Sequence, residues 1–285
     1  MSRPIVLLLL LLTLAGCGSE DRVGDIAADA RRELREQREK LRAEVRRVRD
    51  RIDAFIGRIE QAVPRARRTS PEVERRDRVG SETVDAFLTD VLKSVDRYWT
   101  HTFAANDLPE PRVAYAWLPP GRVVQTGCGS PADDSAAFYC PADDTIYVAQ
   151  RFAAALYSGT LHGLPGESAG GHAAGDFGVA YVVAHEYAHN LQHELGLFSL
   201  ARANSSEPFE LQADCLAGAW GSSVYAAGKL QPGDIQEAVG TALAVGDFDV
   251  SSANHHGTPV ERRDAWLEGF RGADPSGCAR YVPAT

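Results

Sequence analysis

Cysteine and lysine are both scarce in this chain of 285 residues. It has five cysteines, and no two of them form the C-x-x-C spacing that is typical of cysteine zinc sites, so we do not expect a metal site of that kind. Only three lysines accompany 27 arginines. Arginine binds phosphate and carboxylate groups well, but a GC-rich genome produces the same bias, and we favour the genomic explanation.

Basic side chains of either kind are few in the greater part of the chain. Residues 79–285 carry 11 basic and 25 acidic side chains, a net charge of −14. Contacts to nucleic-acid phosphates need clustered Lys and Arg, so no nucleic-acid partner is expected there.

The length and the 44% hydrophobic content suit one large domain with appendages better than two equal domains.

The apolar run at the N-terminus, residues 5–14, is too short for a comfortable membrane span and follows Arg3, as in a secretory signal peptide. Its end, Leu14-Ala15-Gly16-Cys17, resembles the bacterial lipobox. The resemblance implies removal of residues 1–16 and acylation of Cys17, which would anchor the protein to the cell membrane, facing the periplasm or the cell exterior. Residues 17–24 would be the tether. The alternative is a plain signal peptide with an incidental cysteine.

Residues 25–63 are highly charged and contain no proline. Two interleaved series of apolar residues repeat every seven positions, which predicts a coiled-coil helix able to self-associate or to bind a partner helix: Leu34, Leu41, Val48 and Phe55, with Val45, Ile52 and Ile59. Residues 31–68 have a net charge of +7, so contact with anionic lipid head groups is the alternative role. Pro64 and Pro71 break the helix, which predicts a flexible linker over residues 64–79, and the main domain should occupy residues 80–285.

Export to an oxidising compartment would favour disulfides among the four cysteines other than Cys17. Three pairings exist. Cys128 and Cys140 flank a short loop, so we pair them, which leaves Cys215 on a predicted helix to pair with Cys278 near the C-terminus.

The main domain shows the patterns of an α+β fold that is mostly α. Apolar spacing predicts an amphipathic helix over residues 81–104, and short β-branched or aromatic runs predict strands over 112–118 and 145–149 in one small sheet. The glycine-rich residues 159–178 should form a substrate-facing loop or a lid. Further helices are expected at residues 177–196, 206–227 and 259–271.

The motif His185-Glu186-Tyr187-Ala188-His189 lies on the first of these further helices. Residues four apart share one helix face, so both imidazoles can bind one zinc ion, with Glu186 beside its open position as a general base. The alternative is an ordinary buried helix. A catalytic zinc site needs a third protein ligand, and the position that a metzincin would use holds Leu195.

Glu210 and Asp214 share one face of the next helix. The order of the two motifs looks like that of a gluzincin, which would make Glu210 the third ligand and Asp214 a carboxylate that orients an imidazole. The alternative is an acidic edge that faces solvent.

A series of sequence blocks, in order from about residue 80 to residue 281, is similar to the bacterial neutral zinc metallopeptidase family. The blocks are Cys128-Gly129, Phe138-Tyr139-Cys140-Pro141-Ala142-Asp143, Ile146-Tyr147, Gly175-Asp176-Phe177, the HExxH motif, Glu210-Leu211-Gln212-Ala213-Asp214-Cys215-Leu216-Ala217-Gly218, Gly233-Asp234-Ile235 and His256-Gly257-Thr258. Tyr187-Ala188 departs from the family pattern, which usually has a small Gly before the second His, and the coiled coil is not part of that pattern. Neither departure removes a proposed ligand.

The resemblance implies a zincin-like peptidase that binds Zn²⁺ through His185, His189 and Glu210 and cleaves a peptide or protein substrate. Glu186 would take a proton from water and pass it to the leaving amine, while His256 is a candidate donor to the oxyanion. Two other functions remain open from the sequence. One is a catalytically silent, lipid-anchored envelope scaffold, and the other is a zinc amidase that acts on cell-wall cross-links.

Overall fold

The computed structural model of the chain describes Arg32, residues 81–200 and residues 205–282. The expected signal peptide, the acylation of Cys17, the coiled coil and the linker lie outside these residues, apart from the single helical residue Arg32, and therefore stay predictions. Within the described residues the order of elements is α2 (Ser81–Ala104), β1 (Ala114–Leu118), β2 (Val124–Gln125), β3 (Pro131–Ala132), β4 (Ala137–Cys140), β5 (Thr145–Ala149), α3 (Gln150–Tyr157), the 3₁₀ helix η1 (Pro165–Ala169), α4 (Asp176–Glu194), α5 (Leu197–Leu200), α6 (Glu207–Ala226), α7 (Asp234–Val245), α8 (Pro259–Gly272) and the 3₁₀ helix η2 (Pro275–Arg280). The fold is α+β and mostly α, as predicted.

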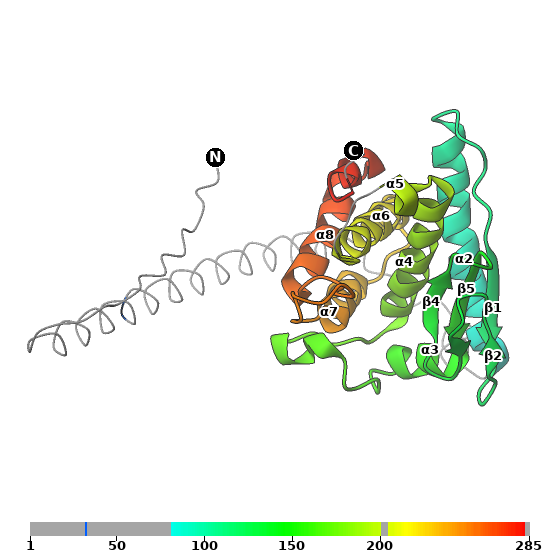
Figure 1. Cartoon of the computed structure of the whole chain (residues 1–285), viewed down its shortest axis with the longest axis vertical. Coiled ribbons are helices and arrows are strands. Elements are labelled where there is room, and N and C mark those ends of the chain that lie inside the picture. Colours follow the sequence, from blue (N-terminus) through cyan, green and yellow to red (C-terminus); the bar gives the residue numbers. More distant parts are fainter. Residues whose placement is uncertain (1–31, 33–80, 201–204, 283–285) are drawn as a thin grey trace, which may run out of the picture. The chain divides into compact units, whose positions relative to one another are not determined.

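The main sheet has three strands in the order β1-β5-β4 (Figure 1). The two predicted strands, β1 and β5, pair in parallel from Ala114 opposite Thr145 to Leu118 opposite Ala149. β4 pairs antiparallel with β5 and forms one edge of the sheet. The sequence does not indicate β4, because its four residues end at Cys140, within the loop that Cys128 and Cys140 flank.

Helix α4 is the centre of the fold. It packs against α2 and β4 on one side and against α6 and α7 on the other (Figure 1). Most of its residues are buried, in agreement with the nearly continuous apolar run that leads into the HExxH motif. Burial from several sides fixes the side chains that α4 presents to the site.

Helices α6 and α8 approach each other closely. A Cβ atom at Gly218 would lie 2.1 Å from the carbonyl oxygen of Trp266, and one at Gly269 would lie 1.8 Å from that of Cys215. Only glycine permits this separation of the two backbones. The close approach brings the first turns of α8 against the acidic face of α6.

Both expected disulfides are present. Cys128 is bonded to Cys140, and Cys215 on α6 is bonded to Cys278 in η2. The second bond connects the helix that carries Glu210 and Asp214 to the C-terminal segment of the domain.

The glycine-rich segment contains η1, which packs against α7. The backbone N–H of His172 donates to the carbonyl of Gly240 on the same helix at 3.1 Å. Pro165, at the start of η1, lines the cavity described below, while the role of the segment as a substrate-facing loop or a lid stays a prediction. In the part of the chain described here, no helix is long and apolar enough to cross a membrane.

Three carboxylates meet where α4 begins. Oxygen atoms of Asp176, Asp234 and Glu237 lie within 4.8 Å of one another, and Glu237 Oε2 accepts from the N–H of Phe177 at 3.0 Å. Burial raises the pKa of Glu237 against the effect of that hydrogen bond, and with the added effect of the charges of Asp176 and Asp234 the pKa reaches about 7. The native state therefore keeps a proton that the unfolded chain has released, and stability should fall as the pH rises from about 4.5 to 7.

Glu237→Gln keeps the acceptor for Phe177 but removes the charge. We expect the variant to be more stable than the parent at pH 8 by about 1 kcal/mol, a value reduced because the side chain is partly exposed. Urea unfolding at pH 5, 6, 7 and 8 measures this. The pH slope should shrink without vanishing, because burial also raises the pKa of Asp234, to about 6. An unchanged slope would contradict the assignment of the proton to Glu237.

Candidate metal centre

Helix α4 places two imidazoles one turn apart on one face. Nε2 of His185 lies 3.1 Å from Nε2 of His189, and the rings stand nearly perpendicular, at 86°. Two imidazole nitrogens that face each other at this distance cannot both carry a hydrogen on that side. The arrangement favours a cation between them.

Glu210 on α6 completes a triangle of donor atoms. Its Oε2 lies 3.2 Å from Nε2 of His185, and its Oε1 lies 3.4 Å from Nε2 of His189. Tetrahedral zinc with bonds of 2.0 to 2.1 Å requires donors separated by roughly 3.3 Å. One donor atom from each of the three side chains lies within 4.8 Å of the other two, so the three residues fit the zinc ion that the sequence predicts.

The electrostatic field around the triangle also favours a cation. Burial lowers the pKa of His185, but Asp214 and then Glu210 raise it to about 9 overall, so the site favours positive charge. Burial raises the pKa of Glu210, but the imidazoles and Arg262 more than reverse this and hold it well below its ordinary value.

Asp214 lies behind the first imidazole. The side chain is fully buried, and its Oδ1 lies 2.9 Å from Nδ1 of His185 while accepting from the hydroxyl of Tyr181 at 2.5 Å. The sequence predicts Asp214 in this position, where it can orient the imidazole of His185. The alternative, an acidic edge facing solvent, is wrong, because Asp214 is 0% exposed and the side chain of Glu210 is 14% exposed.

Arg262 on α8 holds both carboxylates and was not predicted. Its Nε donates to Oδ2 of Asp214, and its Nη1 lies 3.3 Å from Oε2 of Glu210. The guanidinium is 4% exposed. Two buried carboxylates require a counter-charge, which the sequence could have suggested, but no spacing rule singles out this arginine among those of the domain.

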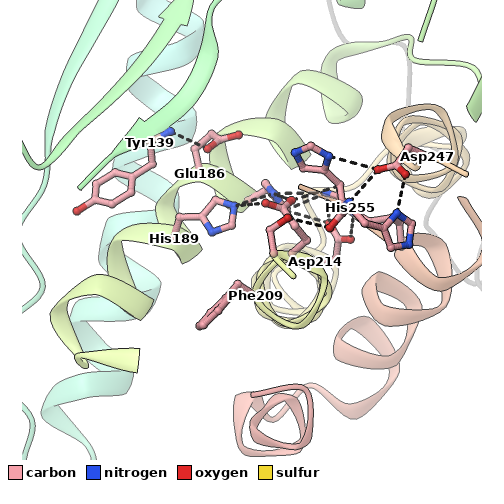
Figure 2. A network of polar contacts seen from close by, with 12 residues as sticks. Tyr139, Glu186, His189, Phe209, Asp214, Asp247 and His255 are labelled. Atoms are coloured by element: carbon pink, nitrogen blue, oxygen red, sulfur yellow. Dashed lines mark hydrogen bonds and ion pairs between the residues drawn. The ribbon is translucent and has the colours of Figure 1, made fainter. Parts of the chain in front are cut away.

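Glu186 lines the same cavity as the three donor side chains and is 8% exposed. Its Oε2 accepts from the backbone N–H of Tyr139 on β4 at 2.8 Å (Figure 2). Burial raises the pKa of Glu186, against the charges of His185 and His189. A carboxylate held in this way is available to accept a proton from a water molecule in front of it.

The triangle opens into a cavity of about 430 Å³. Its other walls combine residues of the edge strand with apolar side chains from several elements: Ala137, Phe138, Phe152, Pro165, Val182 and Val245. The donor side chains thus share the cavity with apolar side chains and with residues of the sheet edge.

His256 lines the same cavity from the loop before α8, and its side chain is 52% exposed. Asp247 accepts from the backbone N–H of His256 at 2.8 Å and from the neighbouring His255, whose Nδ1 lies 2.5 Å away (Figure 2). The loop therefore keeps His256 at the cavity. Its role as an oxyanion donor stays a prediction.

The remaining histidines near the motif do not join the donors. His193 lies one turn beyond His189 and places Nδ1 2.7 Å from the hydroxyl of Tyr139, away from the triangle. His162 and His172 are exposed. Among the described residues three groups could hold an ion, and only His185, His189 and Glu210 include two imidazoles.

Comparison with known proteins agrees with this geometry. The family model described as "Putative neutral zinc metallopeptidase" matches residues 54–281. The chain is 34% identical over 179 residues to the uncharacterized protein YpfJ of Escherichia coli K12, a match that covers 56% of this chain and 58% of that protein. It is 31% identical over 216 residues to the uncharacterized protein Rv2575 of Mycobacterium tuberculosis H37Rv, covering 67% of this chain and 68% of that protein.

No solved structure matches the chain. The family match covers most of the sequence, including all the donor residues, Glu186 and Arg262. The chain therefore belongs to the neutral zinc metallopeptidase family.

Proposed function

We propose that the protein is a zinc-dependent peptidase that acts outside the cytoplasm, anchored to the cell membrane through a lipid on Cys17. The observation that carries the catalytic part is the triangle of His185, His189 and Glu210, with Glu186 lining the same cavity. The anchor rests on the lipobox resemblance of the N-terminal sequence.

Zinc in this site would supply Lewis acidity, which lowers the pKa of water and polarises the scissile carbonyl. Glu186 takes the proton of the attacking water and delivers it to the leaving amine. The hydrogen bond from Tyr139 holds one carboxylate oxygen, so the other is directed to the water. His256, at the cavity wall, would donate to the oxygen of the scissile carbonyl as negative charge develops on it.

The edge strand β4 supports a peptide as substrate. Ala136 accepts from Ala149, and because strand residues alternate, the backbone groups of Ala137 and Tyr139 point away from β5. The N–H of Tyr139 is used by Glu186, which leaves its carbonyl and the groups of Ala137 for an added strand. An extended peptide bound there would pass directly in front of Glu186.

The complete set of catalytic groups argues against a silent scaffold. A protein without activity would not require a buried carboxylate next to the donor triangle, since burying such a group costs free energy.

Metal removal tests the proposal. The purified protein should contain about one zinc ion per chain and cleave unfolded casein. 1,10-Phenanthroline should abolish cleavage and added Zn²⁺ should restore it, whereas 1,7-phenanthroline, which does not chelate, should have no effect. Cleavage that persists without zinc would refute the mechanism, and bound zinc with no cleavage of any peptide would favour the scaffold.

A further inference from the structure

The second imidazole, His189, is oriented in a different way from the first. Its Nε2 faces the donor triangle, and its Nδ1 lies 2.9 Å from Oε1 of Gln192. An amide oxygen can only accept, so Nδ1 carries the hydrogen and the lone pair of Nε2 faces the triangle. This is the tautomer that a metal ligand needs.

Gln192 is itself held by further hydrogen bonds. Its amide nitrogen donates to the carbonyl of Phe209 at 2.8 Å and to Oε1 of Gln212 at 3.1 Å. The amide nitrogen of Gln212 donates in turn to the carbonyl of Cys278 at 3.3 Å. Both glutamines are buried, with Gln192 0% and Gln212 5% exposed.

The direction of this chain of hydrogen bonds is determined by its ends. The backbone carbonyls of Phe209 and Cys278 can only accept, so each glutamine must present its nitrogen to them and its oxygen toward His189. A carboxylate at either position would place oxygen against oxygen. The disulfide to Cys215 holds Cys278, the last acceptor, against α6.

We propose that Gln192 and Gln212 are positioning residues that act in series on His189 and so raise the zinc affinity of the site. His185 is oriented by the charged Asp214. His189 is oriented instead by a relay of two neutral side chains, Gln192 and Gln212, whose last hydrogen bond is to the carbonyl of the disulfide-bonded Cys278. The inference rests on the proposed function, because it assumes that the site binds zinc.

Replacement of each glutamine by methionine, which has similar size and cannot hydrogen-bond in this way, tests the relay. Competition with a chromophoric chelator gives the zinc affinity. Gln192→Met should weaken zinc binding about tenfold to a hundredfold, and Gln212→Met should weaken it about threefold to tenfold. The visible absorption of the Co²⁺-loaded protein should change in Gln192→Met, because the imidazole would turn relative to the metal.

The double variant distinguishes a relay from two separate packing defects. Once Gln192 is gone, Gln212 has nothing to orient, so the double variant should bind zinc within about twofold of Gln192→Met alone. Losses that multiply would overturn the proposal. Gln150, which is buried with an unpaired Oε1 and lies outside the cavity, provides the control, and Gln150→Met should leave the affinity unchanged.

Two further results would be decisive. Zinc affinities of folded Gln192→Met and Gln212→Met equal to that of the parent protein would refute the relay while leaving the peptidase proposal intact. A parent protein that binds no zinc would refute both. If Gln192→Met does not fold, Gln212→Met carries the test, since it lies one hydrogen bond farther from the metal.

Discussion

Glu186→Gln should lower the rate of peptide hydrolysis by a factor of about 10³ or more while leaving zinc bound. General-base catalysis contributes roughly 10² to 10⁴ in rate, and the amide cannot accept the proton of water at neutral pH. The substitution is nearly isosteric, and the amide oxygen can still accept from the N–H of Tyr139, so the cavity should keep its shape. Casein cleavage and zinc content, measured on the same preparation, check both statements.

Glu194→Gln is the matched control for this change. Glu194 lies on the same helix, eight residues farther along, and its carboxylate accepts from the backbone of Arg112 outside the cavity. The same loss of charge there should leave hydrolysis within about twofold of the parent rate. Equal activity in Glu186→Gln and the parent protein would rule out Glu186 as the base.

Arg262→Leu should destabilise the fold by roughly 3–5 kcal/mol, since it leaves Asp214 buried without its main counter-charge. Burial raises the pKa of Asp214, but the charges of Arg262 and His185 more than reverse this and hold it below its ordinary value. Loss of Arg262 should therefore raise that pKa and loosen the orientation of His185. Urea unfolding measures the first effect, and zinc affinity measures the second.

The adjacent Arg263 offers a control on the same helix. It pairs with Asp264, whose side chain is 42% exposed and stays solvated when its partner is removed. Arg263 is itself buried, so its removal loses packing, but no buried charge is left unpaired and Arg263→Leu should cost less than Arg262→Leu. The double variant Asp214→Asn/Arg262→Leu should recover about 2 kcal/mol relative to the sum of the single changes. Additive losses would contradict a direct charge pair at the centre of the site.

Much of the fold follows from local patterns. Helix α2 begins and ends at the predicted residues, α6 is one residue shorter than predicted at each end, and α8 is one residue longer at its C-terminal end. The bounds of these helices can be predicted because each helix has a long amphipathic or apolar stretch and clear terminal signals. β4 and α7 escaped prediction. β4 has only four residues, and its identity as a strand depends on its pairing with β5.

By itself the sequence determined the local part of the site. Helical periodicity places the two histidines one turn apart, and the short loop between Cys128 and Cys140 indicates their pairing. Tertiary packing decided the rest. The contact of Glu210 with the imidazoles, the counter-charge from Arg262 and the hydrogen bond from Tyr139 to Glu186 join residues far apart in the chain. Such contacts depend on how helices and strands pack, which no spacing along one element specifies.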